Sequence, residues 1–152
     1  MLIIAGRAAN AQQARIVKFD ELAKMMSQQN DTTYIFNFFA TWCEPCVKEF
    51  PAFQRFSSRY AGKKMRLIFV SLDFKKDFSK RLLPFLKKKH VKNEVVLLDE
   101  PNGNSWIDNV DSTWDGGLPA TLVVNNQKHI RQIFARDFTY TLLETAMKPF
   151  LP

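Results

Sequence analysis

The stretch TTYIFNFFATWCEPCVKEFPAF, residues 32–53, decides the fold of this 152-residue chain. Its first part, residues 32–40, is rich in aromatic and β-branched side chains, which predicts a buried strand. From Val47 to Tyr60, apolar residues recur every three or four positions, so a helix is expected to begin near Cys43. Pro51 falls inside this helix and is expected to kink it.

Strand-like and helix-like segments alternate on both sides of this stretch. Asp20 is expected to cap the first helix, and Asn126 and Gln127 are expected to join the last two strands in a hairpin. The pattern predicts an α/β domain, with a central mixed sheet of about five strands and helices on both faces. Further strands are expected at 15–19, 65–72, 94–98, 120–125 and 129–135, further helices at 21–28, 77–90 and 138–150, and an irregular stretch up to Gly117.

The length and the charge distribution of the chain limit the classes of protein to which it can belong. With 152 residues, 46% of them hydrophobic, one domain with a single core is expected. The net charge of +7 is local, because residues 75–92 hold eight basic side chains and one acidic side chain, which leaves 14 of each sign elsewhere. No motif for nucleic-acid binding accompanies this basic segment. An anionic membrane leaflet or an acidic partner is the better expectation.

The first fourteen residues are expected to lie outside the domain, which then spans residues 15–152. A short apolar run, Leu2 to Ala5, precedes Ala9-Asn10-Ala11, a sequence similar to the end of a signal-peptidase site. The apolar run is too short for a complete signal peptide. Residues 1–14 are therefore interpreted as a signal-peptide remnant or a disordered terminus.

The pair Cys43 and Cys46 carries the strongest chemical signal. A cysteine at a helix N-terminus meets free N–H groups and the positive end of the helix dipole, which favour its thiolate, whereas Cys46 lies one turn further in. Cys43 is thus expected to attack a substrate disulfide and Cys46 to resolve the mixed disulfide, with Pro45 starting the helix. A structural staple, a zinc site and haem attachment fit less well. The four-residue loop is short, the two histidines are distant, and Val47 stands where haem attachment needs histidine.

Residues 37–51, NFFATWCEPCVKEFP, resemble the active-site segment of the TlpA/ResA-like thiol:disulfide oxidoreductases of the thioredoxin-fold superfamily. The later GGLPAT, residues 116–121, resembles the second hallmark of this family, a cis-proline before a strand. The resemblance implies a thioredoxin-like fold with the family's inserted helix and strand at residues 77–98. It also implies a cis bond at Pro119 and a free backbone at Leu118 for an extended substrate segment.

Two positions near the cysteines differ from thioredoxin. A buried aspartate of thioredoxin is replaced by Asn37, which cannot exchange protons, and Glu49 matches an acid of ResA-like proteins. A desolvated Glu49 would have a raised pKa and could carry the Cys46 proton. Glu44 adds negative charge beside Cys43 and opposes its thiolate.

Most of the 14 phenylalanines are expected in the core. Phe39 and Trp42, which flank the approach to Cys43, are expected to form an apolar rim for substrate. The core set is expected to include Phe36, Phe38, Phe50, Phe53 and Phe56.

The resemblance implies dithiol/disulfide exchange, in the reducing direction, with protein substrates in an extracytoplasmic compartment; apocytochrome c is one candidate. It further implies a membrane protein as electron donor, a monomer, and no metal, haem or nucleotide cofactor.

Two alternative functions share the fold. A peroxiredoxin-like peroxidase would need Thr and Pro before its cysteine, where Trp42 stands, and a Cu(I) metallochaperone would need a longer cysteine spacing and a histidine near Pro119.

Overall fold

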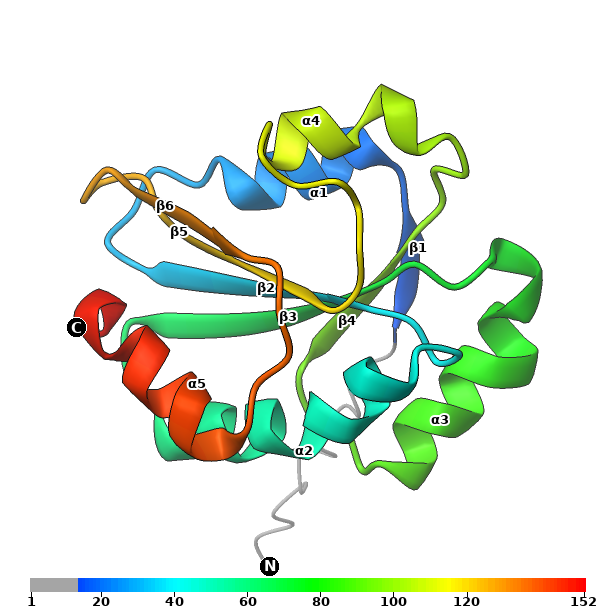
Figure 1. The fold of residues 1–152 in the computed structure, drawn as a ribbon, viewed down its shortest axis with the longest axis horizontal. Coiled ribbons are helices and arrows are strands. Elements are labelled where there is room, and N and C mark those ends of the chain that lie inside the picture. Colours follow the sequence, from blue (N-terminus) through cyan, green and yellow to red (C-terminus); the bar gives the residue numbers. More distant parts are fainter. Residues whose placement is uncertain (1–13) are drawn as a thin grey trace, which may run out of the picture.

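The computed structural model describes residues 14–152, which form a six-stranded mixed sheet with helices on both faces (Figure 1). The strand order is β1-β4-β3-β2-β5-β6, so all six predicted strands belong to the sheet, which was expected to have about five. Strands β1 to β4 pair in parallel, and β5 pairs antiparallel with both β2 and β6. The strands are β1 (Arg15–Val17), β2 (Thr33–Phe39), β3 (Met65–Ser71), β4 (Glu94–Leu98), β5 (Ala120–Asn125) and β6 (Ile130–Phe134).

The helices divide into two layers because the central strands are apolar on both faces. All seven residues of β2 are buried, as expected of a strand covered on both sides. Helices α1 (Phe19–Met26) and α4 (Ile107–Val110) lie on one face, and α2 (Glu44–Arg59), α3 (Leu83–Lys88) and α5 (Tyr140–Met147) lie on the other (Figure 1). The predicted α/β, thioredoxin-like fold is confirmed.

Each face of the sheet has its own core. On the α2 side, Phe39, Phe50, Phe53 and Phe56 are completely buried among aliphatic and other aromatic side chains. On the α1 side, Phe36 and Phe38 are also completely buried, and the Phe38 ring packs on Trp106 and Trp114. The phenylalanines assigned to the core from the sequence are therefore buried.

The ends of the first elements differ from the expectation. Strand β1 stops at Val17, and Lys18, not Asp20, is the N-cap of α1. Asp20 lies in the first turn of α1, where its negative charge suits the helix dipole. The expected signal-peptide remnant falls on residues outside the described part of the chain, except for Ala14, which is buried in the core.

The segment expected as one helix at 77–90 is divided into three. A 3₁₀ turn at Lys75–Asp77 leads into a π-helical turn at Phe78–Leu82 and then into α3. Pro84, in the first turn of α3, has no N–H to donate to the preceding turn, which explains why a regular α-helix does not run through this point. The apolar residues still face inward, since Leu82 and Leu86 are buried.

Two other regions differ in detail. The stretch expected to be irregular contains a 3₁₀ turn at Gly103–Ser105 and the short helix α4. The last helix begins at Tyr140, after Thr139 as N-cap, and ends in a 3₁₀ turn at Lys148–Phe150. In the described part of the chain, no helix is long and apolar enough to cross a membrane.

Candidate active site

Cys43 and Cys46 form a disulfide where β2 passes into α2, with their Cα atoms 5.3 Å apart. Cys43 is the N-cap of α2 in an extended conformation, and its carbonyl accepts the Val47 N–H at 3.0 Å. The predicted strand-to-helix placement of the pair is therefore correct. Pro45 lies in the first turn, where its missing N–H costs no helical hydrogen bond.

The two sulfur-bearing residues differ in access. Cys43 keeps 6% of its surface exposed, whereas Cys46 has none. The unpaired N–H groups of the first helical turn and the positive end of the helix dipole favour negative charge at Cys43. Its sulfur is therefore a better nucleophile and leaving group than that of Cys46. Glu44, the next residue, is exposed, as its position at the helix start predicts.

Glu49 lies on α2, three residues after Cys46 and so on the same face of the helix. Its side chain is buried, with 2% of its surface exposed. Both carboxylate oxygens accept hydrogen bonds: Oε1 from Asn37 Nδ2 at 3.0 Å, and Oε2 from the Phe138 N–H at 2.9 Å. The side chain is thus not a solvated surface group.

Burial raises the pKa of Glu49 from 4.5 to about 7. The hydrogen bonds from Asn37 and Phe138 stabilise the carboxylate and oppose this rise, while the nearby negative charge of Asp137 adds to it. A carboxyl group with a pKa close to neutrality can accept and return a proton at ordinary pH.

Asn37 connects Glu49 to the strand that follows Pro119. Its Nδ2 donates both to Glu49 and to Thr121 Oγ1, at 3.0 and 3.3 Å. Its Oδ1 is buried and, among the described residues, accepts no hydrogen bond. If the amide turned over, this oxygen could accept a hydrogen bond from the O–H of a neutral Glu49, so the contact suits both states of the acid.

The loop before β5 supplies the second side of the site. The Leu118–Pro119 peptide bond is cis, Pro119 is buried and Leu118 is half-buried. No hydrogen bond within residues 14–152 uses the backbone N–H or C=O of Leu118. These groups are therefore free of internal partners, as substrate binding by Leu118 would require.

Only one of the two expected rim residues is accessible. Trp42 has 57% of its surface exposed, but Phe39 has none. The Phe39 ring packs on Phe50 and Phe69, at centroid distances of 5.2 and 5.8 Å. The assignment of Phe39 to a substrate rim is wrong, because its side chain points to the face of the sheet that α2 and α3 cover.

Asp73 is a site residue that sequence reasoning missed. Its carboxylate accepts the Thr41 N–H at 3.1 and 3.2 Å and the Thr41 hydroxyl at 2.6 Å, and the Ser71 hydroxyl donates to it at 2.6 Å. These bonds hold the loop that carries Trp42 and Cys43. The sequence pattern that could have indicated it is a polar residue directly after a predicted buried strand. Such a residue lies at the sheet edge where the cysteine loop also begins.

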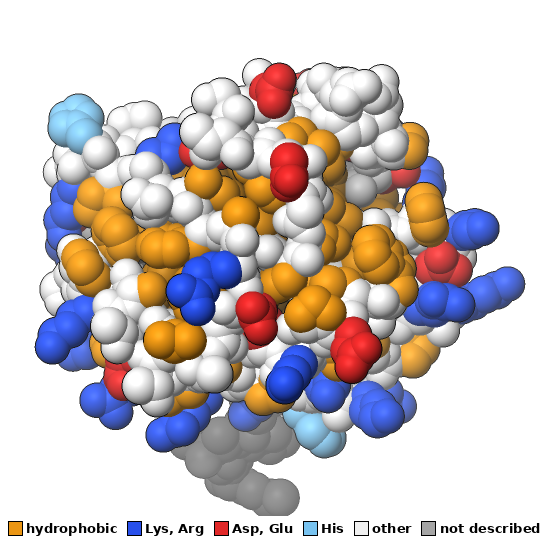
Figure 2. All heavy atoms as spheres, in the orientation of Figure 1, with side chains coloured by type: hydrophobic (Ala, Val, Ile, Leu, Met, Phe, Trp, Pro, Cys, Tyr) orange, Lys and Arg blue, Asp and Glu red, His pale blue; other side chains and the backbone are white. Residues whose placement is uncertain are grey.

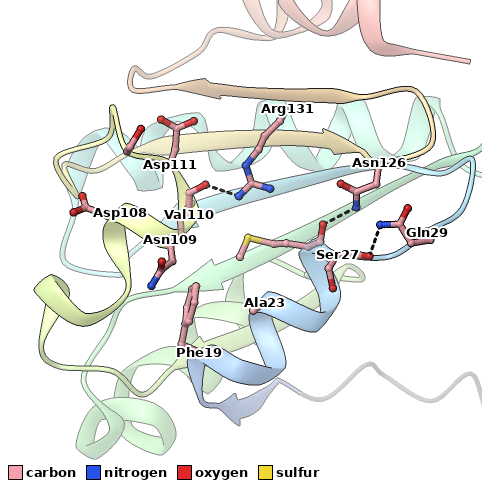
Figure 3. Close-up of a pocket in the computed structure, with 12 residues that line it drawn as sticks. Phe19, Ala23, Ser27, Gln29, Asp108, Asn109, Val110, Asp111, Asn126 and Arg131 are labelled. Carbon is pink, nitrogen blue, oxygen red and sulfur yellow. Dashed lines mark hydrogen bonds between the residues drawn. The ribbon is translucent and has the colours of Figure 1, made fainter.

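A pocket of about 530 Å³ lies apart from this site, between α1 and α4, on the sheet face opposite α2 (Figure 3). Arg131 donates to the Val110 carbonyl there, and Asn126 donates to the Met26 carbonyl, so these polar groups join elements of the fold. Nowhere in residues 14–152 do three His, Cys, Asp or Glu side chains gather as a metal site would require.

Comparisons with known proteins agree with this geometry. The thiol-disulfide oxidoreductase ResA of Oceanobacillus iheyensis is 35% identical over 54 residues, which cover 36% of this chain and 28% of that protein. A thioredoxin-related protein from Neisseria meningitidis superposes with a TM-score of 0.67 and 26% identity, over 79% of this chain and 85% of the other. A secreted Mycobacterium tuberculosis disulfide oxidoreductase superposes with a TM-score of 0.59 and 13% identity, over 80% and 84%.

The fold and the cysteine pair thus define a thioredoxin-like protein, and the resemblance to ResA is confirmed. A family model for AhpC/TSA proteins matches residues 8–133, and the chain belongs to this family.

Proposed function

We propose that this protein is a thiol-disulfide oxidoreductase that reduces disulfides of protein substrates. The observation that carries the proposal is the Cys43–Cys46 disulfide at the start of α2, with the acid Glu49 buried one turn behind it. Cys43 retains access to a partner, Cys46 is shielded, and Glu49 can hold a proton.

In the proposed reaction, the thiolate of Cys43 attacks one sulfur of a substrate disulfide. A Cys43–substrate disulfide forms, and the first substrate thiolate leaves. Cys46 then transfers its proton to Glu49 and attacks the Cys43 sulfur, which forms the Cys43–Cys46 disulfide and releases the second substrate thiolate. Two electrons pass from the enzyme dithiol to the substrate. A membrane-bound dithiol donor would return them in a second exchange of the same kind.

The free backbone groups of Leu118 are proposed to pair with an extended substrate segment, next to Trp42 and Pro119. Glu44 and Pro45 are proposed to tune the redox potential of the pair. We place the protein in an extracytoplasmic compartment, acting as a monomer without a bound cofactor. The resemblance to ResA and the secreted relative from M. tuberculosis support this placement, because disulfides persist outside the cytoplasm.

Trapping of substrates tests the proposal directly. A Cys46→Ser variant keeps the attacking thiol but cannot resolve the intermediate, so it should accumulate mixed disulfides with its protein substrates, apocytochrome c being one candidate. Cys43→Ser is the matched control and should trap none. Equal trapping by both variants, or failure of the wild-type protein to reduce insulin disulfides, would contradict the proposed function.

The role of Glu49 needs a separate test. Glu49→Gln should slow resolution of the mixed disulfide by about tenfold or more, because the acceptor of the Cys46 proton is lost. The reactivity of the two thiols against pH, described by joint pKa values, should change as well. Glu21→Gln, at an exposed position of α1 on the other face of the sheet, is the control. Profiles of Glu49→Gln that superimpose on those of the wild type would remove Glu49 from the mechanism.

A further inference from the structure

An exposed aromatic surface lies beside the cysteine pair. Trp42 and Phe74 are the most exposed large hydrophobic side chains of the described residues, at 57% and 60%. Trp42 follows Thr41 and Phe74 follows Asp73, and the hydrogen bonds of 2.6 to 3.2 Å between Thr41 and Asp73 hold the two segments together. Both aromatic side chains are therefore held at the sheet edge that carries Cys43.

Basic side chains continue this surface along the inserted helix. In residues 75–92, eight Lys and Arg side chains accompany the single acid Asp77. Lys75 lies 3.7 Å from Asp99, and Arg81 lies 4.0 Å from Asp77. The other six have no carboxylate within 4.0 Å in the part of the chain that the structure describes.

Two of these unpaired lysines, Lys76 and Lys80, belong to the end of the segment near the cysteines. The Lys76 Nζ atom lies 5.7 Å from the centre of the Phe74 ring. Lys80 follows four residues later. Asp77 and Arg81, which have the same spacing in this segment, lie 4.0 Å apart, so side chains four residues apart here face the same side. Phe85 anchors the segment to α2, with its ring 5.2 Å from that of Phe50.

The lysine charge at this edge is not cancelled by the nearby carboxylates. Asp99 already pairs with Lys18 at 3.1 Å and with Lys75 at 3.7 Å. Glu44, beside Cys43, is a single exposed acid. In Figure 2, Lys and Arg side chains project from the right-hand edge of the molecule, where Figure 1 draws α3, next to exposed hydrophobic side chains.

We propose that Trp42, Phe74, Lys76 and Lys80 form a docking surface for an acidic segment that flanks the substrate disulfide. The aromatic rings would cover apolar atoms beside the disulfide, and the two lysines would pair with carboxylates further along the substrate. This inference rests on the proposed disulfide exchange and adds a preference among substrates to it.

A protein partner fits this surface better than an anionic bilayer. The aromatic part of the surface adjoins Cys43, which has to meet the substrate sulfur. A membrane seated on Trp42 and Phe74 would cover the accessible cysteine and block exchange. An acidic substrate segment uses the same charges and leaves its own disulfide in front of Cys43.

The preference for acidic substrates can be tested with three disulfide-linked peptides. They share one sequence except at the positions flanking the cysteine, which hold Glu, Gln or Lys. Reduced protein is mixed with each peptide, and the reaction is quenched with acid and resolved by chromatography. The Glu peptide should react about tenfold faster than the Lys peptide at low salt, with the Gln peptide between them. This difference should shrink as the salt concentration increases toward 1 M, because the attraction is screened.

Charge reversal at two positions tests whether Lys76 and Lys80 cause the preference for the acidic peptide. Lys76→Glu with Lys80→Glu should abolish or invert the order of the Glu and Lys peptides. Lys87→Glu with Lys88→Glu, at the far end of α3, makes the same change in net charge and should leave the order in place. An equal effect of both double variants would overturn the docking surface, since it would show an effect of overall charge.

Other outcomes are equally decisive. Equal rates for all three peptides in the wild type overturn the preference but leave disulfide exchange intact, whereas no reaction with any peptide or with insulin refutes the proposed function itself. Sedimentation with phosphatidylcholine vesicles, with and without phosphatidylserine, tests the membrane. Binding only to the anionic vesicles, lost in Lys76→Glu with Lys80→Glu while peptide rates stay equal, would assign the surface to a bilayer.

Discussion

Two N–H groups donate hydrogen bonds to the Glu49 carboxylate, but almost no solvent reaches it. The hydrogen bonds favour the charged form and the burial favours the neutral form, and the balance of these two effects sets the pKa. Because burial outweighs the bonds from Asn37 and Phe138, the pKa of Glu49 rises to about 7. The folded chain therefore holds this proton more tightly than the unfolded chain, in which the pKa is near the ordinary 4.5. The contribution of Glu49 to the free energy of unfolding must fall as pH rises between these two values, by about 3 kcal/mol in total.

Glu49→Gln is expected to remove this pH dependence. The free energy of unfolding of the oxidised wild type should decrease from pH 5 to pH 8 relative to that of the variant, as urea titrations at several pH values would measure. Glutamine can replace the contacts, since its oxygen can accept from Phe138 and its amide can donate to Asn37 Oδ1 once the Asn37 amide turns over. Glu44→Gln should follow the wild type, and parallel curves for all three proteins would show that Glu49 ionises normally.

Asp73 is expected to stabilise the loop before the cysteines. Asp73→Ala leaves the N–H and hydroxyl of Thr41 and the hydroxyl of Ser71 without their acceptor, so it should lower the free energy of unfolding by about 2–3 kcal/mol. It should also slow disulfide exchange, because Trp42 and Cys43 lose their support. Asp108→Ala, an exposed control, should change neither quantity. An unaltered melting temperature of Asp73→Ala would contradict the assignment.

At the scale of elements, the start of α5 is tied to the site. The Thr139 hydroxyl accepts the Leu142 N–H at 3.3 Å as the N-cap of α5, and the preceding residue, Phe138, donates to Glu49. The cap therefore fixes the position of one of the two groups that hold the acid.

Thr139→Ala should lower the free energy of unfolding by about 1 kcal/mol, as loss of an N-cap usually does. Thermal unfolding would measure this change. Thr141→Ala, at an exposed position of the same helix with no side-chain hydrogen bond in the described structure, should have little effect. If the two variants lose the same stability, the Thr139 hydroxyl does not act as a cap.

At the scale of the whole molecule, the fold is shared with peroxidases, but the surroundings of Cys43 differ from the peroxidase pattern. Trp42 precedes Cys43, and Arg55, the first arginine of α2, lies over the Tyr140 ring at 3.8 Å. This guanidinium is engaged with an aromatic ring further along the helix.

Reduced protein should therefore consume hydrogen peroxide slowly in comparison with its reduction of insulin disulfides. The two second-order rate constants, measured at the same pH and with the Cys43→Ser variant as blank, would test this expectation. A fast, saturable reaction with peroxide would reverse the assignment and favour the peroxidase alternative.

The sequence by itself determined the order of the main elements and the position of the cysteine pair. Strands β4 and β5 have the predicted bounds, and Cys43 lies at the predicted helix start. These features depend on local patterns: alternation or helical spacing of apolar residues, and the one-turn separation of Cys43 and Cys46. Such patterns are complete within a few residues, so no knowledge of the remaining chain is needed.

Only the tertiary structure decided which side chains meet at the site. The Phe138 N–H reaches Glu49 from 89 residues away, and the Asp73 carboxylate holds Thr41 across 32 residues. The burial of Phe39 follows in the same way from its place between α2 and α3, where Phe50 and Phe85 cover its ring. These contacts are set by strand order and by the packing of helices on the sheet, so the physical reason is long-range packing, which local periodicity does not specify.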